Sequence, residues 1–261
     1  MRIILFTAFL SFATPAGAAP PSVFIEELTW TEVRDAIAGG ATTAIYYAGS
    51  TEQNGPHMVT GKHNFIARNV AGRIASALGN ALVYPVMPFA PTGGAADKSG
   101  HMRFPGSVTV GEETFAAVAR DVAASARAAG FKAVLLMGDH GGGQKALEAV
   151  AAGLEAQWGA TGTHVYYIPD TYFASGRRVE GLLRARGLPV GAHAGIPDTS
   201  ELMAIDPSSS WIRRDRLQAG DAMNGVDGDP RPSSAELGRL FLDIKVEAAV
   251  AQIRQRLGPG G

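Results

Sequence analysis

The sequence predicts an α/β fold in which a mostly parallel sheet is covered by helices on both faces. Three observations predict this fold. Strand-like and helix-like segments alternate along the chain, residues 133–137 (AVLLM) are continuously apolar, and 33 glycines and 15 prolines supply many tight turns. A continuously apolar strand is typical of a parallel sheet that is buried on both faces. Strands that alternate with helices favour the same arrangement.

The first half of the sheet follows from short patterns. Residues 42–48 (TTAIYYA) form a β-branched and aromatic run that ends at Gly49, which predicts a buried strand. Between His63 and Leu78, apolar residues recur every four positions, which predicts one face of a helix. Residues 81–87 (ALVYPVM) then predict the next strand.

The second half continues the alternation. An apolar helical stripe begins at Phe115 and is stopped by Gly130, just before the apolar strand 133–137. A helix is predicted over 144–158 and a strand over 164–168. Near the end, Ser233 and Glu236 have the spacing of a capping box, which predicts a last helix that ends at about Leu257.

The chain is long enough for one large domain. It has 261 residues, of which 46% are hydrophobic and 18% charged, so it can bury a substantial core. No internal repeat or long linker divides it, and we expect a single domain over residues 20–261. Residues 207–232 carry several Asp, Gly and Pro, and the sequence assigns them no function.

Composition excludes several classes of function. The formal net charge is −1 and no basic run stands out, which argues against a nucleic-acid partner. The chain has no cysteine, which excludes disulfide scaffolds, thiolate metal sites and cysteine nucleophiles.

The N-terminus has the pattern of a secretory signal. Arg2 precedes the apolar run 3–12, and small residues follow at 16–18. A run of about 10 residues is too short to cross a bilayer about 30 Å thick as a helix. We therefore expect residues 1–19 to be a signal peptide and the mature protein to be exported to the periplasm, with no membrane contact after cleavage. An uncleaved N-terminal anchor is the alternative.

Five of the six histidines lie in loops after predicted strands or in glycine- and proline-rich turns. In α/β folds, ligands gather beyond the carboxyl ends of the strands, so the loops that begin at Gly49, Pro88, Gly138 and Pro169 are candidates for the site. Without cysteine, a metal site there has to use nitrogen and oxygen ligands. The five histidines are His57, His63, His101, His140 and His193.

Other common catalytic patterns are missing. The chain has no G-x-S-x-G nucleophile elbow, no H-E-x-x-H zinc helix and no G-x-G-x-x-G fingerprint after a strand. Residues 138–145 (GDHGGGQK) have glycines five apart, but Gln stands where a phosphate-binding loop has its lysine.

Several stretches resemble the creatininase family. GSTEQNGPH at 49–57 resembles the family's opening motif, Gly-Ser-x-Glu-Gln-His-Gly-Pro-His. Similar stretches follow in the family's order and cover most of the mature chain. The resemblance implies a three-layer α/β/α fold, assembly as a homo-oligomer, and hydrolysis of C–N bonds in cyclic or linear amides with one or two divalent metals. These stretches are HMRFPGS (101–107), GDHGGG (138–143), AHAGIPDTS (192–200) and GDPRPSSAELGR (228–239).

The resemblance carries four residues over to this chain. Glu52 matches the family's first carboxylate ligand, and His140 matches the histidine ligand of the glycine turn. His193 matches a histidine that acts on the substrate or the leaving group. Asp198 stands where the family has a glutamate near the metals, and it is shorter by one methylene.

Three positions depart from the family pattern. Asn54 replaces a histidine ligand, His63 replaces the aspartate that bridges the two metals, and Asp139 stands where glycine is usual. A carboxylate can bridge two metals, whereas a neutral imidazole offers one nitrogen to one metal. We therefore expect a one-metal site held by Glu52, His63 and His140, with zinc as the first candidate ion and manganese or iron as alternatives.

The remaining site residues follow from this hypothesis. The metal activates a water for attack on an amide, Asp198 or Asp139 holds or deprotonates that water, and His193 protonates the leaving nitrogen. His57 and His101 are candidate substrate contacts, with a packing or structural role as the alternative for each. Lys62 is expected to be a solvated residue at the start of a helix.

The resulting prediction is a metal-dependent amidohydrolase that acts on a small-molecule amide. A second interpretation remains because Asn54 and His63 replace the family's metal ligands. In this interpretation, the protein is a catalytically inactive relative that binds a ligand on the same fold. A third reading, a metal-dependent peptidase or lactonase, changes only the substrate.

Overall fold

The fold is described by a computed structural model for residues 20–258, except positions 207, 209 and 222. The predicted signal peptide at 1–19 lies outside the described residues. Among the described helices, none combines the length and the apolar character that crossing a membrane requires.

The central sheet has four parallel strands in the order β2-β1-β3-β4. The strands are β1 (Thr43–Ala48), β2 (Ala81–Val83), β3 (Ala133–Gly138) and β4 (His164–Tyr167). In the register of the two central strands, Ala48 lies opposite Gly138, so β1 and β3 end at the same level. The predicted parallel sheet is confirmed.

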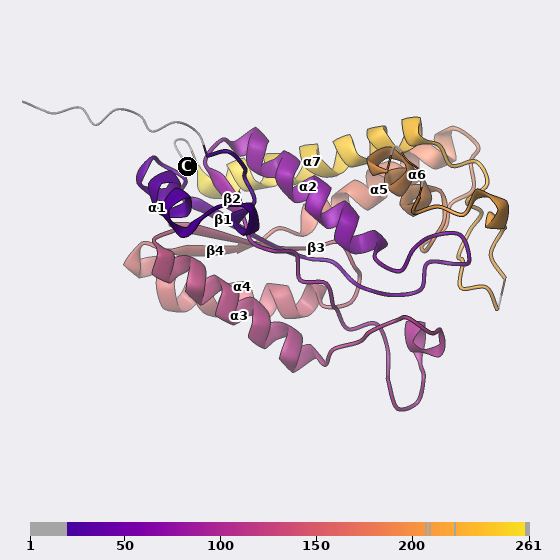
Figure 1. The fold of residues 1–261 in the computed structure, drawn as a ribbon, viewed down its shortest axis with the longest axis horizontal. Helices are drawn as coiled ribbons and strands as arrows, with labels where there is room; N and C mark the ends of the chain where they lie inside the picture. The colour runs from indigo at the N-terminus through magenta and orange to yellow at the C-terminus, as the bar shows by residue number, and fades with distance from the viewer. Residues whose placement is uncertain (1–19, 207, 209, 222, 259–261) are drawn as a thin grey trace, which may run out of the picture.

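Helices cover both faces of the sheet (Figure 1). Helices α2 (Lys62–Leu78) and α7 (Ala235–Leu257) lie on one face, where they pack against Ile45 and Tyr47 of β1. Helices α3 (Glu112–Ala129) and α4 (Gln144–Trp158) lie on the other face, against Ala44 and Tyr46. Alternate residues of a strand point to opposite faces, so this arrangement confirms the three-layer architecture.

Most predicted boundaries agree with the structure within two residues, and two need correction. Regular pairing of β2 stops at Val83 rather than residue 87, since Pro85 has no amide hydrogen to donate. The cap of α7 is Ser234, not Ser233: its side chain accepts a hydrogen bond from the amide of Leu237 at 3.1 Å.

Three helices were not predicted from the sequence. They are α1 (Trp30–Ala38), α5 (Phe173–Ala185) and α6 (Ile196–Ile205). Short 3₁₀ helices join the larger elements at Ile25–Glu27, Gly100–Arg103, Gly159–Thr161, Pro169–Thr171 and Arg214–Arg216. Helices α5 and α6 lie with one end of α7 on the right of Figure 1, beyond the carboxyl ends of the strands.

Helices α6 and α7 pack closely because Gly238 has no side chain. A Cβ built at Gly238 would lie 1.8 Å from the carbonyl oxygen of Ser200. This contact matters for function because α6 carries Asp198 and Glu201, and α7 carries Lys245.

The first prediction tests this contact. We expect Gly238→Ala to lower the free energy of unfolding by about 2 kcal/mol or more, because the helices have to separate to admit a methyl group. Gly153→Ala is the matched control, since a Cβ at this exposed helical position meets nothing within 4 Å. The control should raise stability by about 0.5–1 kcal/mol. Urea denaturation of both variants measures the difference, and equal stabilities would contradict the close packing.

Candidate metal centre

The site is built around the fully buried carboxylate of Glu52. Its Oε2 lies 2.8 Å from Nε2 of His140, and its Oε1 lies 3.1 Å from Nε2 of His63. Two further imidazoles stand slightly farther from Oε1, with His193 Nδ1 at 3.8 Å and His101 Nε2 at 3.9 Å. The structure therefore gathers four histidines around one carboxylate.

The parallel sheet explains this convergence. Glu52 follows β1 and His140 follows β3, and these neighbouring strands end at the same level. His63 belongs to the first turn of α2, which returns over the same edge, rather than to a loop as the sequence suggested. His101 lies in the 3₁₀ helix Gly100–Arg103, and His193 precedes α6.

A chain of buried charges holds His63. Its Nδ1 lies 2.9 Å from Oδ2 of Asp139, whose Oδ1 accepts a hydrogen bond from Nζ of Lys245 at 2.9 Å. Lys245 also donates to Oε2 of Glu201 at 2.7 Å. Asp139 therefore orients an imidazole, with both of its oxygens occupied, and this arrangement does not favour the predicted role of Asp139 as a base for water.

These contacts and burial shift the pKa values of the three buried carboxylates. Burial raises the pKa of Glu52, but hydrogen bonds from His140 and His63 outweigh it and bring the pKa well below its ordinary value. Burial opposes ionisation of Asp139 too, yet Lys245 and His63 keep its pKa low. Burial raises the pKa of Glu201 to about 7. The carboxylates nearest the histidines thus stay ionised, as metal ligands and their supports have to be.

A second buried ion pair lies beside the first. Nζ of Lys62 is 2.8 Å from Oδ2 of Asp198, which also accepts a hydrogen bond from the amide of Ala194 at 2.8 Å. Lys62 is fully buried, so the expectation of a solvated lysine was wrong. Burial raises the pKa of Asp198, but Lys62 and His63 lower it well below its ordinary value. Asp198 is therefore a weak base here.

His193 presents a free nitrogen to the site. Its Nε2 lies 2.9 Å from the backbone carbonyl oxygen of Gln53, so Nδ1 is the nitrogen that faces Glu52. Burial lowers the pKa of His193 to about 4, helped by the positive charge of Lys62. The imidazole is therefore neutral at pH 7 and can accept a proton.

His57 does not reach the site. Its side chain is fully buried, and Nε2 lies 3.0 Å from Oγ1 of Thr199. Protein encloses the ring, so the predicted contact with substrate has no support in this arrangement. Asn54 is likewise turned away, because its Nδ2 donates to the backbone carbonyl oxygens of Glu52 and Val59.

The side chains of Glu52, His63 and His140 fit a single divalent ion. One ligand atom from each lies within 4.8 Å of the others. Two ligands of a tetrahedral zinc lie about 3.3 Å apart when each bond is about 2.0–2.1 Å long, so contacts of 2.8 and 3.1 Å need to open only slightly. The amide of Gly142 donates to Nδ1 of His140, which leaves the proton on Nε2. Binding of a metal at Nε2 would require this proton to move to Nδ1, which would break the hydrogen bond from Gly142.

A cavity of ≈ 730 Å³ opens from this cluster. Helix α5 forms one wall with Phe173 and Arg177, and Tyr172 lies beside them. The cavity contains every predicted site residue except His57. Those residues are Glu52, His63, His101, Asp139, His140, His193 and Asp198.

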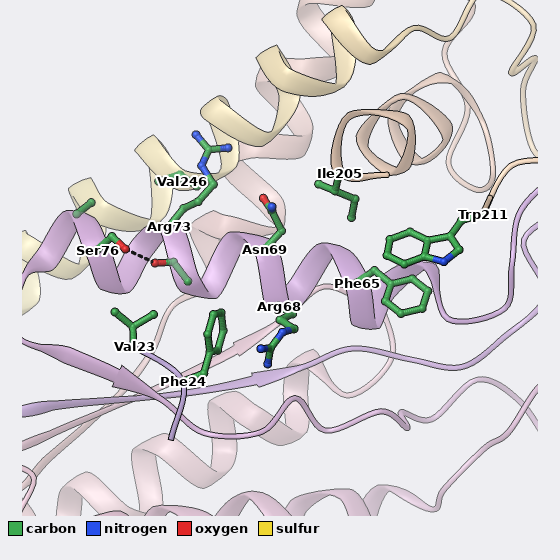
Figure 2. Close-up of a pocket in the computed structure, with 12 residues that line it drawn as sticks. Val23, Phe24, Phe65, Arg68, Asn69, Arg73, Ser76, Ile205, Trp211 and Val246 are labelled. Carbon is green, nitrogen blue, oxygen red and sulfur yellow. Dashed lines mark hydrogen bonds between the residues drawn. The ribbon is translucent and has the colours of Figure 1, made fainter. Parts of the chain in front are cut away.

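A second, slightly larger cavity of ≈ 810 Å³ runs along the outer side of α2, but it lacks a cluster of titratable groups (Figure 2). Two of its three aromatic residues, Phe65 and Trp211, stack on each other with ring centroids 3.9 Å apart. Its two cations are already paired, Arg68 with Glu26 and Glu27, and Arg73 with Asp243. The first cavity is therefore the candidate active site.

Sequence reasoning missed four residues of the site: Gln53, Lys62, Glu201 and Lys245. A lysine inside an apolar helical stripe was the one available signal, since Lys245 lies between Ile244 and Val246. Gln53 lies in the motif at 49–57, but the resemblance assigned it no role. The unassigned stretch 207–232 contributes as well, because its Gly225 accepts a hydrogen bond from Gln53 at 3.1 Å.

Comparison with known proteins points to one family. The family model described as Creatininase, creatinine amidohydrolase, matches residues 26–253. A mycofactocin precursor peptide peptidase of Mycobacterium ulcerans (strain Agy99) is 28% identical over 240 residues, which cover 82% of this chain and 85% of that protein. A creatinine amidohydrolase of Pseudomonas putida is 24% identical over 262 residues, 91% of this chain and 98% of that protein.

Solved structures share the fold. A structure titled Creatininase Mn has a TM-score of 0.76 at 23% identity and covers 91% of this chain and 100% of its own. A mutant creatininase of the Zn-Zn type has a TM-score of 0.74 at 22% identity, with 91% and 99% coverage.

Asp139 gives the second prediction. Because it fixes the orientation and tautomer of His63, we expect Asp139→Asn to weaken zinc binding by about 10–100-fold. Asp227→Asn, at another residue that lines the cavity, is the control and should bind zinc like the wild type. Isothermal titration calorimetry measures both affinities. Unchanged zinc affinity in Asp139→Asn would show that the carboxylate does not support the ligand.

His57 gives the third prediction. Burial lowers its pKa to about 4, against about 6.5 in the unfolded chain. Between these values the unfolded state binds more protons, so stability is full above pH 6.5 and falls as the pH drops towards 4. The loss reaches up to about 3 kcal/mol. In His57→Gln this part of the pH dependence should disappear, as measured by urea denaturation across pH 4–7. Parallel profiles of stability against pH for the variant and the wild type would refute the contribution of His57.

Proposed function

Because the chain belongs to the creatininase family, we propose that it is a hydrolase that cleaves an amide C–N bond with the help of one divalent metal. Glu52, His63 and His140 would hold the ion. The observation that carries this proposal is the buried Glu52 carboxylate, with one imidazole nitrogen within 3.1 Å of each of its oxygens.

The buried charges favour one ion over two. Three buried carboxylates, those of Glu52, Asp139 and Glu201, and the partly exposed carboxylate of Asp198 lie around the ammonium groups of Lys62 and Lys245. The carboxylates outnumber the ammonium groups by two charges, or by one when Glu201 is protonated. One divalent cation balances this difference closely, whereas a second would leave an uncompensated positive charge in a low-dielectric interior.

When bound, the metal supplies a Lewis acid that polarises the amide carbonyl and makes a water acidic enough to attack at neutral pH. The chain's own residues then handle the proton. His193 takes a proton from the attacking water at Nδ1 as the new C–O bond forms. It returns the proton to the leaving nitrogen as the C–N bond breaks. Asp198, paired with Lys62, contributes charge rather than a proton.

The cavity favours a substrate larger than a small ring. A volume of ≈ 730 Å³ admits groups on both sides of a linear amide. The relatives include a peptidase as well as a creatinine amidohydrolase, so we extend the proposed substrate class from non-peptide amides to short peptides. Zinc stays the first candidate metal and manganese the second, since the solved creatininases include a Zn-Zn type and a manganese form. A homo-oligomer stays an expectation.

The fourth prediction tests the reaction. Zinc-loaded protein should hydrolyse at least one member of a panel of cyclic amides, linear amides and dipeptides, and chelation should abolish the activity. His193→Ala should lose about 10²–10⁴-fold in kcat while it keeps its zinc, whereas His140→Ala should lose both zinc and activity. Retained activity in His193→Ala would reject its role in proton transfer. Tight binding of a panel member without turnover would favour the inactive ligand-binding alternative.

We also propose that the protein is exported. The family match starts at residue 26, so the charged and apolar segment of 1–19 precedes the matched region. The fifth prediction is that expression of the full chain in a Gram-negative host yields a periplasmic protein whose N-terminus, by mass spectrometry, is at or near Pro20. Arg2→Glu is the control and should slow export. Intact residues 1–19 on a membrane-bound protein would favour the uncleaved anchor.

A further inference from the structure

The side-chain amide of Gln53 is fixed in one orientation. Its Oε1 accepts a hydrogen bond from the amide of Gly55 at 2.9 Å, and its Nε2 donates to the carbonyl oxygen of Gly225 at 3.1 Å. A Cβ at Gly225 would lie 2.2 Å from Oε1, so a glycine is needed for this approach. One hydrogen on Nε2 is left for another partner.

Two histidines compete for that hydrogen. Gln53 Nε2 lies 3.0 Å from Nδ1 of His101 and 3.0 Å from Nε2 of His193. Nε2 of His193 also lies 2.9 Å from the backbone carbonyl oxygen of Gln53, and a carbonyl only accepts. Nε2 of His193 therefore carries a hydrogen, and the remaining Gln53 hydrogen goes to Nδ1 of His101.

The two rings consequently share one tautomer but present opposite chemistry to the cavity. His101 accepts at Nδ1, so its proton is on Nε2, the atom that faces Glu52 at 3.9 Å. His193 donates through Nε2, so the nitrogen that faces Glu52 at 3.8 Å, Nδ1, is bare. The ring centroids are 4.5 Å apart, which places a donor and an acceptor side by side.

We propose that Gln53 is a positioning residue that makes His101 a hydrogen-bond donor and His193 a proton acceptor on the substrate side of the cluster. Resting on the proposed function, this assigns His101 to the carbonyl oxygen of the scissile amide. The negative charge that grows on this oxygen during attack is stabilised by a donor held in place beforehand. The same attack releases the proton that His193 takes up at Nδ1.

The tautomers can be read directly by NMR. Protein labelled with nitrogen-15 at its six histidines is recorded in long-range proton–nitrogen spectra at about pH 8, above the ordinary histidine pKa of about 6.5. His101→Gln and His193→Gln assign the two signals. We expect both rings to show a protonated Nε2 and a bare Nδ1. His164 is the internal reference, since its Nδ1 lies 2.8 Å from Oε1 of Glu155 and should carry the proton.

Variants of Gln53 test whether this side chain sets the tautomer of His101. Gln53→Glu offers only acceptors, so Nδ1 of His101 should gain a proton. Gln53→Leu should leave His101 as a mixture of tautomers. His164 should be unchanged in both. A wild-type spectrum with a proton on Nδ1 of His101, or a His101 tautomer unchanged in both variants, would overturn the inference without needing any activity.

Zinc added to the same samples separates this inference from the proposed function. We expect the signals of His63 and His140 to change as they become ligands, while His101 keeps its proton on Nε2. Loss of the His101 proton to zinc would overturn the inference, because the pair of His101 and His193 would then be a second metal site. Unchanged signals from His63 and His140 would instead reject the metal centre and leave the tautomers standing.

Discussion

The structure depends on one constraint, the burial of the Glu52 carboxylate where β1 and β3 end. An ionised carboxylate in a protein interior is costly unless positive charge and hydrogen-bond donors surround it. The chain places imidazoles from four different segments around Glu52, and a divalent ion placed between them would complete the balance of charge. Because β1 and β3 are adjacent and in register, their loops bring Glu52 and His140 together at one edge of the sheet.

The surrounding charges follow from the same constraint. His63 is held on its far side by Asp139, and Asp139 is neutralised by Lys245, which reaches in from α7. The close packing of α6 on α7 brings Glu201 to the same lysine. Lys62 and Asp198 form a separate buried pair. The ammonium groups thus provide part of the positive charge that a second metal would bring, which fits the proposed one-metal cluster without a carboxylate at residue 63.

The sequence predicted the sheet, its flanking helices and the grouping of Glu52 with His63 and His140, because these rest on local patterns and on a family motif. Apolar periodicity located α2 and α4 to within two residues and the start of α3 to within three, and the resemblance marked Glu52, His63 and His140. It did not predict the buried lysines, since a single charged residue on a helix is usually solvated and only tertiary packing encloses it. The sequence also could not predict that His101 presents a donor and His193 an acceptor. These tautomers depend on hydrogen bonds from Gln53 to residues that are 48 and 140 positions away in the chain.

The central claim is that the cluster around Glu52 holds one divalent metal ion per chain. Elemental mass spectrometry of the purified mature protein, beside a His63→Ala variant, tests it most directly. We expect about one zinc or manganese ion per wild-type chain and none in the variant. Two ions per chain would contradict the charge balance drawn from Lys62 and Lys245. No ion after incubation with zinc or manganese would contradict the metal centre itself.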